Sequence, residues 1–158
     1  MHTPSVIVRA RAFALTLAVV VALVCVAAFA EPTRAVTFIP AVDVDTAFAK
    51  GAPLVETDRY KIHASRRDAA GKAEVHVKDT DIIYVLDGIA TIVTGGAVVD
   101  GTTTAPDEIR GASIRGGSEQ RLVKGDVFIV PNGVPHWFTQ VSDPFLYYVV
   151  KTTDPGAR

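Results

Sequence analysis

Four side chains of metal-binding type are concentrated in two short segments of the sequence. Glu74 and His76 are separated by one residue, Asp81 follows shortly after them, and His136 opens a segment far downstream. Residues i and i+2 of a β-strand face the same side of a sheet, so Glu74 and His76 can present a carboxylate and an imidazole to one point. Divalent metals of intermediate softness bind these donors. If the segments pack as strands of one small barrel, all four side chains can approach a single ion.

Each of these residues alone has a simpler explanation. A lone histidine in a strand is more often exposed or hydrogen-bonded in the core than a metal ligand, and Glu74 and Asp81 would ordinarily be solvated carboxylates. The joint spacing therefore carries the metal-site prediction, and it depends on the elements that position the four side chains.

The elements around these side chains have the pattern of β-strands. Short segments rich in Val, Ile, Thr and aromatic residues alternate with Gly, Pro and Asp clusters, which is typical of an all-β sandwich or barrel. No long segment with a 3.6-residue apolar period lies between them, which disfavours a parallel α/β sheet. The sequence predicts strands at Tyr60–Arg67, Ala73–Lys78, Ile82–Leu86, Ala90–Thr94, Ala97–Val99, Glu108–Ile114, Gln120–Val123, Asp126–Val130, His136–Val141 and Phe145–Lys151.

Two further segments have signals of their own. A short helix is predicted at Thr46–Lys50, with Asp45 as its N-cap and Gly51 just past its end. The stretch Gly95–Gly117 is rich in Gly, Thr and Pro and indicates an irregular excursion between the two halves of the barrel. Such an excursion is either a lid or ligand loop or a plain surface loop, and the residues favour neither.

The first thirty residues have the features of a secretory signal peptide. Arg9 and Arg11 precede an apolar run from Ala12 to Ala30 that ends in small residues. A retained membrane anchor is the alternative, because a run of 19 residues can just span a bilayer. Cleavage after Ala30 would also remove Cys25, the only cysteine, and with it any disulfide or thiolate ligand. The sequence thus predicts an exported protein, periplasmic or extracellular, without a membrane segment after cleavage.

The charge of the chain excludes one class of partner. The sequence holds 16 Lys and Arg against 17 Asp and Glu, and signal-peptide cleavage would leave it more acidic. It contains no basic run of the kind that binds nucleic acid, so no nucleic-acid partner is expected.

The segments that hold the four side chains resemble the two motifs of the cupins, which are double-stranded β-helix jelly rolls. The first cupin motif has two histidines, a glutamate and a glycine, and EVHVKDTDIIYVLDG matches its spacing with Glu74, His76, Asp81 and Gly88. It departs from the motif at two ligand positions, with Glu74 in place of the first histidine and Asp81 in place of the glutamate. The second motif is matched by GDVFIVPNGVPHWFTQ, which departs from it only in Gln140, where cupins have Asn. The resemblance covers about residues 60–151.

The resemblance implies an all-β double-stranded β-helix barrel with one short N-terminal helix. On this basis the chain divides into a signal peptide at 1–30, an N-terminal arm with the helix at 31–59, the cupin barrel at 60–151 and a C-terminal tail at 152–158. Small cupins often form dimers through outer sheet faces, so a homodimer is expected, with Tyr147 and Val149 as candidate contacts.

The resemblance also implies one divalent metal ion, which similar cupins hold with three His and one Glu. Carried over residue by residue, the ligands here are Glu74, His76, Asp81 and His136. Two carboxylates favour Mn or Fe over copper, and Ni or Zn is also compatible. In a second arrangement His76, Asp81 and His136 form a two-histidine-one-carboxylate face, and Glu74 acts beside the metal as a catalytic base. In a third, the barrel has lost its metal and keeps only the fold.

Strand alternation assigns further side chains to a substrate pocket. Residues an even number of positions from Asp81 or His136 on the same strand share the face of that ligand. One more histidine, on an earlier strand, can face inward, although ordinary exposure is the simpler expectation for it. The expected pocket residues are His63, Ile83, Val85, Phe138 and Gln140.

Function follows from this site rather than from the fold, because cupins include dioxygenases, decarboxylases, isomerases, lyases and binding modules. The leading hypothesis is an exported metalloenzyme that acts on a small organic molecule with an enol, carboxylate or diol group. Dioxygenase-type oxidoreduction is the reaction that the family favours. The alternative is a non-catalytic module that binds a small molecule or a metal.

Overall fold

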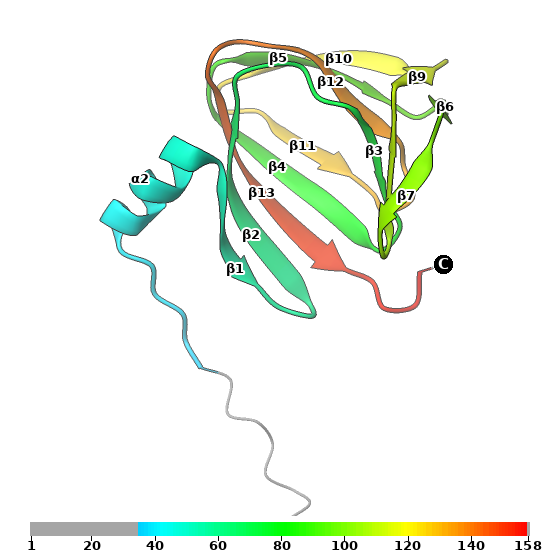
Figure 1. Ribbon diagram of the computed structural model, residues 1–158. Helices are drawn as coiled ribbons and strands as arrows, with labels where there is room; N and C mark the ends of the chain where they lie inside the picture. The colour runs from blue at the N-terminus through cyan, green and yellow to red at the C-terminus, as the bar shows by residue number, and fades with distance from the viewer. Residues whose placement is uncertain (1–34, 158) are drawn as a thin grey trace, which may run out of the picture. The chain divides into compact units, whose positions relative to one another are not determined.

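The computed structural model describes residues 35–157, which contain one helix and thirteen strands (Figure 1). The predicted signal peptide at residues 1–30, with Cys25, lies outside the described residues. Between residues 35 and 157, no helix is long and apolar enough to cross a membrane. The elements are α2 (Ala41–Lys50), β1 (Ala52–Glu56), β2 (Tyr60–Arg67), β3 (Ala73–His76), β4 (Asp79–Asp87), β5 (Ile89–Thr94), β6 (Ala97–Val99), β7 (Thr102–Ala105), β8 (Glu108–Gly111), β9 (Ser113–Arg115), β10 (Ser118–Val123), β11 (Val127–Val130), β12 (His136–Val141) and β13 (Phe145–Thr153).

Two antiparallel sheets enclose the interior of the barrel (Figure 1). One has the strand order β1-β2-β13-β4-β11, the other has the order β10-β5-β12-β3-β8-β7, and β6 and β9 form a separate two-stranded ribbon. The apolar cluster between the sheets includes Ile83 and Phe145 from the first sheet and Ile92 and Phe138 from the second. These two facing sheets confirm the all-β jelly-roll prediction.

Alternation along β4 follows the expected pattern. Asp81, Ile83 and Val85 are buried, whereas Tyr84 between them is exposed. Every second residue therefore faces the interior, as the two-residue period of a strand requires.

The predicted dimer contacts on β13 face the interior instead of the outer surface. Tyr147 is 5% exposed and Val149 is 4% exposed, and both belong to the apolar cluster. The reason is that β13 lies between β2 and β4, and its inward face begins at Phe145. On the outward face, the Tyr148 ring packs edge-on against Phe48 of α2 with 4.9 Å between centroids. Contacts through Tyr147 and Val149 are therefore excluded.

Helix α2 begins five residues earlier than predicted, at Ala41, and Pro40 rather than Asp45 is its N-cap. The Pro40 carbonyl accepts the first helical hydrogen bonds, and no helix breaker follows it. Thr46, the predicted first residue, donates its hydroxyl to the Val42 carbonyl within the helix (2.8 Å). The C-terminal end agrees with the prediction, because Gly51 adopts the left-handed conformation that ends many helices.

The N-terminal arm and the Gly95–Gly117 excursion also contribute strands to the fold. Strand β1 lies in the predicted N-terminal arm and pairs with β2 at the edge of the five-stranded sheet. The Gly95–Gly117 excursion contains the predicted strand Ala97–Val99 as β6, the predicted strand Glu108–Ile114 divided into β8 and β9, and β7, which was not predicted. Its strand β8 pairs with β3, the strand of Glu74 and His76, so the excursion forms part of the barrel wall beside them.

The glycine of the first motif has a steric role that a substitution can measure. Gly88 and Gly125 both have positive φ, +83° and +92°, which disfavours any side chain. A β-carbon at Gly88 would lie 2.7 Å from the Pro144 carbonyl oxygen and closer still to Ser142 Oγ, whereas nothing lies within 4 Å at Gly125. We expect Gly125→Ala to lower the free energy of unfolding by about 1 kcal/mol and Gly88→Ala by roughly 2–4 kcal/mol. Urea unfolding measures both, and equal losses would contradict the steric explanation.

Candidate metal centre

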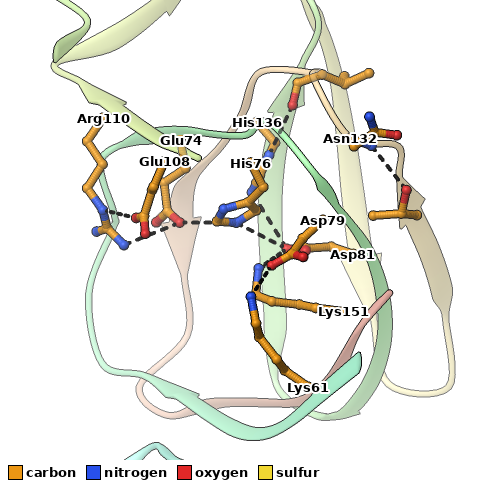
Figure 2. Close-up of polar contacts among 12 residues, drawn as sticks. Lys61, Glu74, His76, Asp79, Asp81, Glu108, Arg110, Asn132, His136 and Lys151 are labelled. Atoms are coloured by element: carbon orange, nitrogen blue, oxygen red, sulfur yellow. Dashed lines mark hydrogen bonds and ion pairs between the residues drawn. The ribbon is translucent and has the colours of Figure 1, made fainter. Parts of the chain in front are cut away.

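Three neighbouring strands place Glu74 in the middle of a row of functional side chains. His136 of β12 lies opposite Glu74 of β3, and Arg110 of β8 lies opposite Glu74 on the other side. His76 is two residues beyond Glu74 and faces the same way. The ligand atoms of Glu74, His76 and His136 all lie within 4.8 Å of one another (Figure 2). This spacing allows the three side chains to bind one ion.

The turn that leads into His136 is attached to the strand pair that carries His76. The Gly133 N–H donates to the His76 carbonyl (2.8 Å). The Asn132 N–H donates to Thr80 Oγ1 (3.1 Å), the contact drawn beside Asn132 in Figure 2. Gly133 adopts a φ of +76°, which favours glycine in this tight turn. These bonds hold the two imidazoles in a defined relative position, with 5.1 Å between ring centroids.

The His136 ring is held in the form that binds metals. Its Nδ1 lies 3.2 Å from the Val134 carbonyl, which can only accept, so Nδ1 carries the proton and Nε2 keeps its lone pair. The side chain is buried, and burial disfavours the charged imidazolium, so the pKa of His136 is lowered. A neutral imidazole oriented by a backbone carbonyl is a common metal ligand.

Asp81 approaches the same point from the opposite sheet, but both of its oxygens are already hydrogen-bonded. Lys151, its partner in the β4–β13 register, donates from Nζ to Oδ1 (2.7 Å) and to Oδ2 (2.9 Å) (Figure 2). Asp81 Oδ2 also lies 3.5 Å from His76 Nε2 and 3.9 Å from His136 Nε2. Burial alone would raise the pKa of Asp81, but its interactions with His76 and Lys151 lower it to about 2. Asp81 is therefore an ionised carboxylate whose charge Lys151 balances.

Glu74 is also surrounded by cations, but at longer distances. Arg67 Nη2 lies 3.5 Å from Oε1, and Arg110 Nη2 lies 3.6 Å from Oε2. Both distances exceed those of good hydrogen bonds. Of the two carboxylates, Glu74 is thus the one whose oxygens remain available to a metal.

A cavity of about 430 Å³ adjoins the four predicted ligands, and its wall includes the predicted pocket residues His63, Ile83 and Phe138. Val85 does not line the cavity. It lies two residues beyond Ile83 on β4 and is wholly inside the apolar cluster. Gln140 is exposed and lies outside it. The register of β12 shifts between Phe138 and Gln140, so the extra residue there reverses the expected alternation.

The sequence analysis did not assign several charged residues to the cavity. Lys151 shares the inward face of Tyr147 and Val149 on β13, which the sequence analysis had assigned to the outer surface, so alternation gave no signal for it. Arg110 had none, since its place depends on β8 pairing with β3. Adjacent strand residues point to opposite sides, so the sequence allowed either Arg66 or Arg67 to reach an anionic substrate at the barrel mouth. Arg67 is the one held inside, where its Nε donates to Tyr147 Oη (3.0 Å).

Comparison with known proteins agrees with this architecture. The family profile described as Cupin matches residues 60–158. No curated protein matches the sequence.

Solved structures similar to this chain include an uncharacterised conserved protein with a double-stranded β-helix domain from Klebsiella pneumoniae, with a TM-score of 0.51 and 16% identity over 78% of this chain and 95% of that one. BH2720 from Bacillus halodurans has a TM-score of 0.51 and 13% identity over 83% and 89%. KdgF from Halomonas sp. has a TM-score of 0.47 and 17% identity over 65% and 77%. At these identities the likeness concerns the fold alone. Because the family profile spans the barrel and both of its motifs, the chain belongs to the cupin family.

Proposed function

We propose that this cupin binds one divalent metal ion through Glu74, His76 and His136 and acts on a small organic molecule in the adjoining cavity. The observation that carries the proposal is the convergence of these three donors within 4.8 Å, on the wall of a cavity of about 430 Å³. Two imidazoles and one carboxylate suit Mn, Fe, Ni or Zn.

The Asp81–Lys151 ion pair supports three protein ligands rather than four. Asp81 would have to exchange two short hydrogen bonds from Lys151 for the metal, whereas Glu74 has no such bonds to give up. Three protein ligands leave coordination positions open for substrate or water, which is typical of catalytic sites. On this proposal Glu74 is a ligand and not the general base.

The chemistry proposed for the site is of the dioxygenase, isomerase or lyase type. When bound, the ion would supply a Lewis acid that polarises an oxygen of the substrate. His136 would present Nε2 to the ion while Val134 holds the Nδ1 proton. Ile83 and Phe138 would exclude water from one side of the cavity, and Lys151 would keep Asp81 charged and oriented.

Export is proposed on the basis of the N-terminal sequence pattern. If the apolar run is a cleaved signal peptide, the protein recovered from its own cells should begin at Glu31 and lie outside the cytoplasm. Intact-mass measurement with N-terminal sequencing checks this, and a chain that retains residues 1–30 would contradict it.

Metal analysis tests the proposed ligands. Residues 31–158 loaded with Mn, Fe, Ni or Zn should retain one ion per chain and gain about 2.7 kcal/mol of stability at an ion concentration of 100 times Kd. His76→Ala, His136→Ala and Glu74→Gln should each lose most of the bound ion. His63→Ala is the matched control, because His63 pairs with Glu56 and is not one of the three converging donors. A wild-type protein that retains none of the four ions would refute the proposal.

The ion pair between Asp81 of β4 and Lys151 of β13, neighbouring strands of one sheet, gives a second, independent test. Lys151→Met should destabilise the metal-free protein by about 3 kcal/mol, because it leaves a buried Asp81 charge without a partner. The Asp81→Asn/Lys151→Met double variant removes both charges and should recover much of that loss. It should also still bind one ion, as measured by elemental analysis. Loss of the ion from a folded double variant would show instead that Asp81 is a ligand.

A further inference from the structure

We infer that the cavity takes a small carboxylate with a neighbouring oxygen donor, such as a 2-hydroxy or 2-oxo acid, and that Arg67 and Arg110 recognise its carboxylate. The inference rests on the proposed function, because the same cavity and the same ion are involved. It adds the chemical class of the ligand and two residues that determine specificity.

The charge of the cavity wall favours an anion. Four cationic side chains face three carboxylates there, but Arg66 is already paired with Asp68 (2.9 Å), so the positive excess comes from the two charges that a divalent ion would add. The cationic residues are Arg66, Arg67, Arg110 and Lys151, and the acidic residues are Glu74, Asp81 and Glu108. A cavity with this excess of positive charge attracts anionic ligands.

The pairing of these charges identifies Arg67 as the group left over. Lys151 is paired with Asp81, Arg66 is paired with Asp68, and Arg110 donates from Nε to Glu108 Oε1. Among residues 35–157, the ion pair of Arg67 is with Glu74, at 3.5 Å. Once Glu74 binds a metal, its charge is shared with the ion, and Arg67 lacks a full counter-charge.

Arg67 is held as a binding group rather than left as a surface charge. Its Nε donates to Tyr147 Oη (3.0 Å), its guanidinium carbon lies 4.6 Å from the centroid of the Phe138 ring, and its side chain is only 23% exposed. An enclosed guanidinium whose nearest carboxylate lies at 3.5 Å can gain further from a ligand carboxylate at hydrogen-bond distance. The fixed, planar guanidinium is suited to binding a carboxylate through two hydrogen bonds.

Arg110 brings a second guanidinium to the other oxygen of Glu74 (Figure 2). It projects from β8, lies opposite Glu74 in the sheet register, and is 42% exposed. An anion bound beside Glu74 would therefore adjoin both arginines. With the carboxylate there, a neighbouring hydroxyl or carbonyl oxygen of the ligand can take an open position on the ion. A volume of about 430 Å³ lies in the lower part of the range of small-molecule sites.

Calorimetric titration tests this with lactate and pyruvate as probes and lactamide as the uncharged control. The protein is residues 31–158 with its metal content measured in every sample. Lactate or pyruvate should bind the loaded protein at least tenfold more tightly than lactamide. Arg67→Met should weaken that binding at least tenfold at unchanged metal content, and Arg110→Met should weaken it too. Arg121→Met, at an exposed arginine outside the cavity wall, should leave binding unchanged.

A second variant displaces Arg67 without removing its charge. A β-carbon at Gly71 would lie 2.6 Å from Arg67 Nη1, so Gly71→Ala should move the guanidinium and weaken lactate or pyruvate binding, with the metal retained. If Arg67→Met itself loses the metal, the inference is tested with Gly71→Ala and Arg67→Lys instead. Weaker lactate or pyruvate binding at unchanged metal content supports it, and unchanged binding overturns it.

The outcomes separate this inference from the proposed function. A loaded wild-type protein that binds neither acid, or binds lactamide equally well, overturns the inference and leaves the metal site standing. Unchanged acid binding in both Arg67→Met and Gly71→Ala would also overturn the inference and leave the metal site standing. If the wild type holds no metal, the proposed function fails, and titration of the metal-free protein decides the inference: binding that depends on Arg67 supports the arginine site, and no binding overturns it.

Discussion

The antiparallel register of β12, β3 and β8 is the constraint on which the candidate site depends. Backbone pairing puts His136, Glu74 and Arg110 in one row, and the period of β3 adds His76 on the same face. A slip of one residue in β3 would turn Glu74 and His76 away from the interior. The turn at Asn132, which precedes His136, is hydrogen-bonded to Thr80 and to the Val77 carbonyl, and these bonds help to fix the register.

The balance of charge inside the barrel then divides the two interior carboxylates by role. Asp81 meets Lys151 across the β4–β13 pair at hydrogen-bond distance, whereas both arginines beside Glu74 lie farther away. Buried charges are stable only when they are paired, so the Asp81–Lys151 pair is complete by itself and Glu74 is not. The metal and anion proposals both follow from this difference. A bound metal ion would give Glu74 the close counter-charge that it lacks, and a bound anion would do the same for Arg67.

Local regularities in the sequence determined the fold class and the centre of the site. The two-residue period of strands placed Glu74 beside His76, and it placed Ile83 on the same face as Asp81. Clusters of Gly, Pro and Asp marked the breaks between strands, and Gly88, at the break between β4 and β5, adopts a positive φ. These features were predictable because side-chain direction in a strand and the conformational freedom of glycine depend only on neighbouring residues.

Tertiary structure decided which strands lie side by side and where alternation is interrupted. The pairing of Asp81 with Lys151 joins β4 to β13, and the position of Arg110 depends on β8 leaving an excursion to join β3. A bulge in β12 turned Gln140 outward, and the central place of β13 turned Tyr147 inward. None of these follows from residue order, because hydrogen-bond partners across a sheet are chosen by packing between segments distant in sequence, and a bulge reverses alternation without a distinctive local signal.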